Sequence, residues 1–100
     1  MSKRFIISAS ASTMSGQDRD DLTRKFTGKD WRVWHWFRDT WLLANVPEAV
    51  TADAIRIEIL SLLPSAQFIA FEFQPGTDAV GVMPKESIEW MMQHWGTSSD

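Results

Sequence analysis

The sequence predicts an α+β domain in which two helices cover one face of a four-stranded antiparallel sheet. Three stretches alternate their side chains with the period of two that is typical of strands, and the stretches between them repeat apolar residues at helical spacing. The length of 100 residues suits one domain. A hydrophobic fraction of 44%, with six tryptophans and six phenylalanines, can fill its core without cysteine, which the chain lacks.

A first strand is predicted from Lys3 to Ala9, the segment KRFIISA. Alternate side chains of a strand point to opposite faces. A loop of small polar residues follows as far as Gly16. One face of the strand would carry Phe5, Ile7 and Ala9, and the other Ile6, Ser8 and Ser10.

A first helix is predicted to begin at Ser15, because Asp18 follows three residues later in a capping-box pattern. Gly28 is a natural end for this helix. Only Leu22 and Phe26 mark its buried stripe, so the nearby charged residues are interpreted as a solvated face.

The stretch from Trp31 to Leu43, WRVWHWFRDTWLL, holds four of the six tryptophans and is interpreted as a hairpin. Its arms are expected to meet in a two-residue turn within residues 38–40 and to end near Val46. Both faces of this hairpin are apolar, so both need cover. One face would carry Trp34, Trp36, Trp41 and Leu43, and the other Val33, His35, Phe37, Leu42 and Ala44.

A second helix is predicted from a Thr51 cap to Pro64, and a further strand from Gln67 to Gln74. Beyond them we expect a short strand at Val80–Met83 and a third helix from Pro84 to Gly96. The apolar stripe of that helix would be Ile88, Met91, Met92 and Trp95. The domain would span residues 1–96, with residues 97–100 as a frayed tail.

The order of these elements is the split β-α-β arrangement of ferredoxin-like folds, βαββαβ, followed by the short strand and helix. We expect the tryptophan face of the hairpin to lie under the helices, together with Ile69, Phe71 and Phe73. The open face of the sheet would then carry Ile6, Ser8, Val33, His35, Phe37, Leu42, Ala44, Phe68, Ala70 and Glu72.

Three segments also carry a resemblance to a known family: His35-Trp36, Asp39 to Leu43 (DTWLL), and Gly81 to Trp90. They resemble a family of small bacterial proteins that is similar in fold to the small CRISPR-associated protein that partners the spacer integrase. The resemblance covers nearly the whole chain. It implies a ferredoxin-like homodimer linked to defence against mobile elements, and a metal-dependent nuclease that uses an aspartate at the end of the first strand.

The chain departs from that family at the position of the aspartate. Where the relatives read Ser-Tyr-Asp, this chain reads Ser8-Ala9-Ser10. A serine hydroxyl is a poor ligand for a hard divalent cation, which prefers carboxylate oxygens. Two histidines 59 positions apart, without cysteine, give no metal-ligand spacing either. We therefore expect no metal site and no cofactor, and the sequence leans against an enzyme.

Two further groups of residues are candidate sites. Ser8, Ser10, His35 and Glu72 contain the residue types of a catalytic triad, but no nucleophile-elbow motif accompanies them. An alternation of arginine and tryptophan is typical of the stacking platforms that bind single-stranded nucleic acid. A net charge of −3 opposes such binding. The residues of this second group are Arg32, Trp34, Trp36 and Arg38.

The sequence therefore predicts a non-catalytic homodimeric interaction module, with a further protein partner also expected. Alternatives are a metal-dependent nuclease or toxin-like ribonuclease, and a binder of single-stranded nucleic acid. The apolar run Phe5-Ile6-Ile7 is too short for a signal peptide or a membrane span, so a cytoplasmic location is expected. The expected dimer interface consists of Ile6, Val33, His35, Phe37, Leu42 and Phe68.

Overall fold

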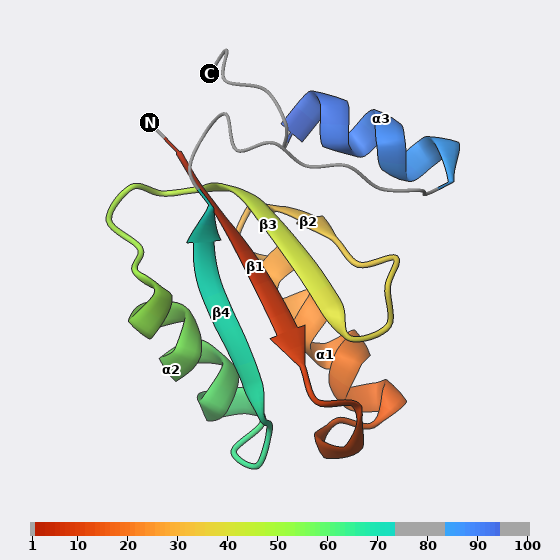
Figure 1. Cartoon of the computed structure of the whole chain (residues 1–100). Helices are drawn as coiled ribbons and strands as arrows, with labels where there is room; N and C mark the ends of the chain where they lie inside the picture. The colour runs from red at the N-terminus through yellow and green to blue at the C-terminus, as the bar shows by residue number, and fades with distance from the viewer. Residues whose placement is uncertain (1, 74–83, 95–100) are drawn as a thin grey trace.

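The computed structural model describes residues 2–73 and 84–94. Its four-stranded sheet has the order β2-β3-β1-β4, and every neighbouring pair of strands is antiparallel (Figure 1). This confirms the α+β class and the four-stranded antiparallel sheet. The strands are β1 (Lys3–Ala9), β2 (Arg32–Trp34), β3 (Thr40–Val46) and β4 (Phe68–Phe73).

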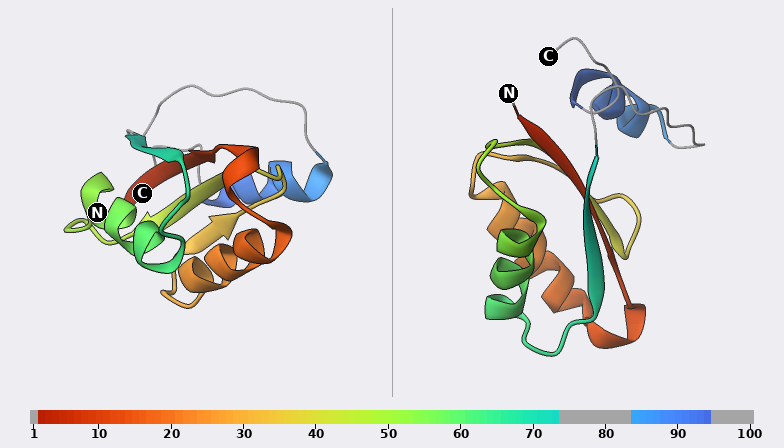
Figure 2. Two further views of the ribbon diagram at one scale, coloured as in Figure 1. Left: turned by 90° about the horizontal axis from the view of Figure 1, so that it is seen from below. Right: turned by 60° about the vertical axis from the view of Figure 1, so that its left-hand side comes forward.

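Two helices, α1 (Gly16–Thr27) and α2 (Ala52–Leu62), lie side by side against one face of the sheet (Figure 2). A short 3₁₀ turn, η1 (Ala11–Thr13), precedes α1. The third helix, α3 (Lys85–His94), packs on the opposite face. The short strand expected at Val80–Met83 and the tail at 97–100 fall outside the described residues.

Side-chain caps begin α1 and α2 as the sequence indicates. The Ser15 hydroxyl accepts a hydrogen bond from the Asp18 amide at 3.0 Å, and the Asp18 carboxylate accepts one from the Ser15 amide at 3.0 Å. This is the predicted capping box, which satisfies two amides that would otherwise lack a partner within the helix. The Thr51 hydroxyl caps α2 by accepting from the Ala54 amide at 3.1 Å.

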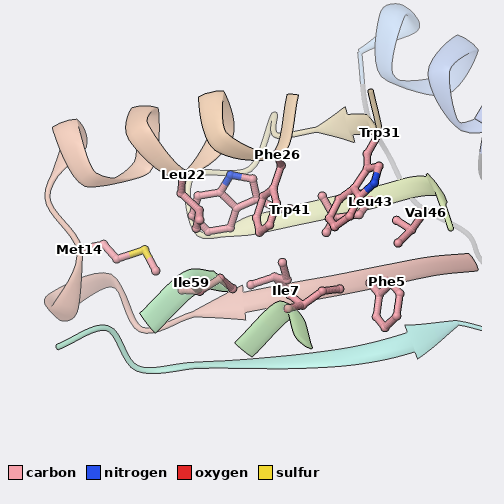
Figure 3. Close-up of a cluster of buried hydrophobic side chains, with 11 residues drawn as sticks. Phe5, Ile7, Met14, Leu22, Phe26, Trp31, Trp41, Leu43, Val46 and Ile59 are labelled. Atoms are coloured by element: carbon pink, nitrogen blue, oxygen red, sulfur yellow. The ribbon is translucent and has the colours of Figure 1, made fainter. Parts of the chain in front are cut away.

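The main core lies between the two helices and the sheet (Figure 3). Trp41 is buried at its centre, and the indole Nε1 donates a hydrogen bond to the Thr23 hydroxyl of α1 at 2.8 Å. The burial of Trp41 and Leu43 confirms that part of the predicted core. The buried members are Phe5, Ile7, Met14, Leu22, Phe26, Trp31, Trp41, Leu43, Val46, Ile55 and Ile59.

The hairpin differs from the prediction because its loop is longer. β2 ends at Trp34, and the strand pairs are Val33 with Leu43 and Trp34 with Leu42. Five residues, 35–39, therefore connect the strands where two were expected. Compared with the predicted two-residue turn, a loop with an odd number of residues shifts the pairing of the two strands by one residue. The side chains of one arm then point to the opposite face from the one predicted. Val33 thus packs in the helix-side core, and Trp34 points to the opposite face.

The face of β4 is likewise opposite to the prediction. β4 pairs with β1 so that Phe68 lies across from Ala9 and Ala70 across from Ile7, on the helix side. Ile69, Phe71 and Phe73 therefore lie on the far side of the sheet. The prediction placed the most apolar face under the helices. It was wrong because register with β1, rather than apolar content, decides which face of an edge strand the helices meet.

On the far side of the sheet, α3 covers a second, smaller apolar cluster. Trp34, Leu42 and Ala44 are buried there. Trp90 and Met91 of α3 pack against them, and Ser87 is completely buried. The predicted stripe of α3 is therefore rotated: Met91 faces the sheet, whereas Ile88 and Met92 are exposed. Trp95 lies outside the described residues.

Candidate functional site

An exposed apolar area occupies the part of the far sheet face next to β4. Side chains that face each other across antiparallel strands point to the same side, and Ile6 pairs with Phe71 while Ser8 pairs with Ile69. Ile69 is 56% exposed and Phe71 43% exposed. We call these four residues, Ile6, Ser8, Ile69 and Phe71, the sheet patch.

The sheet patch is uncharged and almost entirely apolar. None of its four members carries a charge, and only the Ser8 hydroxyl is polar. β4, which supplies Ile69 and Phe71, is an edge strand of the sheet. Exposed apolar side chains on such an edge are suited to contact with another apolar surface.

The loop between β2 and β3 is held in place by a partly buried ion pair between Arg19 and Asp39. Arg19 of α1 is almost fully buried, and its Nε and Nη2 lie 3.0 and 2.9 Å from the Asp39 Oδ1. Arg19 Nη2 also donates to the Ala11 carbonyl at 3.2 Å. The Asp39 carbonyl accepts from the Ala9 amide at 2.9 Å, which fixes the loop to the end of β1. Sequence reasoning missed this pair, because nothing in the spacing of Arg19 and Asp39 indicates contact.

His35 lies in that loop on the helix side of the sheet. Its ring is stacked on Trp41, and its Nδ1 lies 3.0 Å from the Thr40 carbonyl oxygen. A carbonyl only accepts, so Nδ1 is the donor in this contact. The ring lines a shallow, open groove, whose other residues are Asp20, Thr23, Arg24, Thr27 and Val33.

The fold does not bring together the four candidate catalytic residues, which are Ser8, Ser10, His35 and Glu72. Glu72 pairs with Phe5, three positions from Ser8 along β1, which is a separation of about 10 Å. It also points to the opposite face from Ser8. The Ser10 hydroxyl instead lies 3.2 Å from that of Ser12, and His35 lines the groove on the helix side.

The four candidate nucleic-acid-binding residues do not form one stacking surface. They are Arg32, Trp34, Trp36 and Arg38. Because β2 ends at Trp34, the alternation of faces does not continue through Trp36 and Arg38. Trp34 is buried beneath α3, whereas Trp36 is 58% exposed in the loop. Arg32 and Arg38 are both exposed. Arg32 lies near His94 of α3, and burial together with the Arg32 charge lowers the pKa of His94.

The predicted dimer interface is divided between the two faces. Ile6 belongs to the sheet patch, and Leu42 lies beside it but is buried beneath α3. Phe37 is exposed in the loop, with its ring edge-on to Trp34 at 4.9 Å. The placement of Val33 and Phe68 on the open face was wrong, because both pack against the helix-side core. His35 also lies on the helix side, next to Val33 in the groove.

The described parts of the chain offer neither a metal cluster nor a membrane span. Within residues 2–73 and 84–94, no three histidine or acidic side chains gather closely enough to hold a metal ion. Among the helices of those residues, none has the length and apolar character needed to cross a membrane.

No protein-family model, curated protein or solved structure matches this chain. Its function is therefore inferred from its own residues.

Proposed function

We propose that the protein is a non-catalytic homodimeric interaction module that binds a second copy of itself through the sheet patch. The observation that carries this proposal is the exposure of Ile69 and Phe71, beside Ile6, on a sheet face that α1 and α2 leave uncovered. Contiguous exposed apolar surface is costly in water and is typical of interaction sites.

A second copy is the simplest partner for this surface. A two-fold axis brings the same patch of both subunits into the interface, so one set of residues serves both sides. The sheet patch suits such pairing because none of its members is charged, and pairing it with its own copy therefore creates no like-charge contact. A different protein partner is the alternative, and the oligomeric state of the purified chain distinguishes the two.

We further infer a ferredoxin-like domain related to the CRISPR-associated family. The inference is supported by the strand order, in which β1 connects through α1 to β2 and β3 connects through α2 to β4, each passing over a neighbouring strand. The family relation itself depends on the residue pattern at His35-Trp36, Asp39 to Leu43 and Gly81 to Trp90. A role in defence against mobile elements follows from that relation alone.

The test is sedimentation velocity at micromolar concentration. We expect a wild-type dimer, and a folded monomer for Phe71→Glu, because each subunit would place a charge in the shared apolar contact. The matched control is Ile57→Glu on the outer side of α2, where the side chain is 53% exposed. This variant should remain dimeric. A monomeric wild type, or a dimer unaffected by Phe71→Glu, contradicts the proposal.

The exposure of Trp36 favours a second candidate function, the binding of single-stranded nucleic acid. Trp36 and Arg38 are both exposed on a loop that the Arg19–Asp39 pair holds in place. A base stacked on an aromatic ring contributes about 1–3 kcal/mol, so Trp36→Ala should weaken oligonucleotide binding about fivefold or more. Fluorescence anisotropy with a labelled oligonucleotide measures this. Equal affinity of wild type and Trp36→Ala excludes Trp36 as a stacking residue.

A further inference from the structure

The helix α3 has apolar side chains on two sides. Trp90 and Met91 pack on the sheet, and Ser87 is buried with them. Ile88 and Met92 are 42% and 69% exposed. At 3.6 residues per turn, the exposed pair Ile88 and Met92 lies about 130° around the helix axis from the side that packs on the sheet. We call Ile88 and Met92 the outer stripe of α3. A helix with two apolar sides is suited to lie between two other layers.

The outer stripe cannot be covered by the sheet of its own subunit. The inward side of α3 already contacts Trp34, Leu42 and Ala44, so the outer stripe points away from that sheet. Among the described residues, the outer stripe and the sheet patch are therefore separate exposed apolar surfaces. A helix stripe and a sheet face are the usual partners in the packing of α+β proteins.

The two surfaces match in spacing. Ile88 and Met92 are four residues apart on a helix, which is a rise of about 6 Å. Ile69 and Phe71 are two residues apart on a strand, which is about 6.7 Å. A helix running along β4 can therefore place one side chain of its stripe near each side chain of the strand.

We propose that the outer stripe of α3 in one subunit packs on the sheet patch of a second copy, and reciprocally. This inference depends on the proposed homodimer and names the element that covers its patch. The two α3 helices would form a layer between the two sheets, with α1 and α2 of each subunit outside. Ile88 and Met92 of one subunit would meet Ile69 and Phe71 of the other.

The area required by a stable dimer supports the reciprocal arrangement. Stable interfaces bury about 800 Å² on each partner. The sheet patch offers two half-exposed large side chains with smaller neighbours, an area on the order of a few hundred Å². If the outer stripe also enters the interface, each subunit contributes two apolar surfaces rather than one. Direct contact between two sheet patches would leave both outer stripes in water.

Disulfide trapping tests the contact directly, because the chain contains no cysteine. Ile69→Cys and Met92→Cys are prepared as separate single variants, one of them with a size tag, then mixed and oxidised. We expect a mixed disulfide dimer from the pair, and little product from either variant alone. The control pair, Ile57→Cys with Met92→Cys, should give none, because Ile57 lies on the outer side of α2.

Sedimentation of Met92→Glu provides the second readout, and it should yield a folded monomer. A wild-type monomer contradicts both the homodimer and this inference. A wild-type dimer that Phe71→Glu dissociates, but Met92→Glu does not, contradicts only the inference. Efficient homodimeric cross-linking of Ile69→Cys alone also contradicts only the inference, because the two sheet patches would then face each other directly.

Discussion

The imidazole of His35 lies flat on the indole of Trp41, with ring centroids 4.2 Å apart and planes inclined by 2°. Trp41 is also tied to α1 by the hydrogen bond from its Nε1 to the Thr23 hydroxyl. Trp41 therefore joins the loop, the sheet and a helix at one point of the core. Substitutions at this point should be among the most costly in the chain.

Trp41→Ala should destabilise the fold by about 3–5 kcal/mol, the usual cost of emptying a buried aromatic site. Denaturant unfolding at one fixed protein concentration measures the loss, since the proposed dimerisation would make apparent stability depend on concentration. Trp36→Ala is the matched control: this exposed tryptophan should change stability by less than about 0.5 kcal/mol. A loss below about 1 kcal/mol for Trp41→Ala would show that Trp41 is not a central core residue.

Thr23→Val should cost about 1–3 kcal/mol, because it leaves the buried indole N–H of Trp41 without an acceptor. The same substitution should cost less in a Trp41→Phe background, where no N–H remains to be satisfied. A double-mutant cycle from denaturant melts gives the coupling between the two residues. Equal costs in the two backgrounds would show that the hydrogen bond contributes nothing.

Asp39→Ala should destabilise the fold by up to about 3–5 kcal/mol, because it leaves the buried Arg19 charge without its carboxylate partner. Asp53→Ala is the control. It removes an ion pair with Arg56 of similar length, 2.8 Å, between exposed side chains. Such a surface pair contributes less than about 1 kcal/mol. Denaturant unfolding measures the loss of stability in each variant. Equal losses for Asp39→Ala and Asp53→Ala would show that the burial of Arg19 does not make its ion pair more important than a surface pair.

Most of the helices and strands could be predicted from the sequence, because interactions between residues close in the chain determine where they form. The Ser15–Asp18 capping box and the Thr51 cap involve residues three apart, and their hydrogen bonds form as the pattern indicates. The alternation of Phe5 and Ile7 correctly identified the buried face of β1. These features need no knowledge of distant contacts.

The composition of the exposed face could not be predicted, because it depends on register between distant strands. A loop of five residues instead of two moved Trp34 to the face opposite Leu43. The pairing of Ile6 with Phe71 joins residues 65 positions apart, and no local pattern specifies it. Likewise, the helical spacing of Ile88, Met91 and Met92 does not say which of them meets the sheet.

Acidification should destabilise the fold through His94. Burial, and then the charge of Arg32, lower the pKa of His94 in the folded state below the usual 6.5. As the pH falls through 6.5, the unfolded chain gains a proton that the folded chain does not yet bind, so stability falls. The loss continues down to the lowered pKa of the folded state and then levels off.

Histidine NMR titration and denaturant melts across this pH range test the effect. His94→Asn should remove this part of the pH dependence. Arg32→Gln should raise the pKa of His94 only in part, because burial is the larger cause. A His94 that titrates at or above 6.5 in the folded protein would contradict the prediction.

No metal-dependent catalysis is expected at the end of β1. The proposed relation to the CRISPR-associated family would place a metal-binding aspartate there, and this chain has Ser10 instead. Asp39 lies beside this position, since its carbonyl accepts from the Ala9 amide, but its carboxylate is held by Arg19. Ser10 has no carboxylate oxygen for a divalent cation, and the positive charge of Arg19 beside Asp39 Oδ1 disfavours a cation at that carboxylate. We expect no cleavage of labelled RNA or DNA with magnesium or manganese. Cleavage that EDTA abolishes, and that an identically purified Asp39→Asn variant lacks, would show instead that Asp39 takes over the missing aspartate's role.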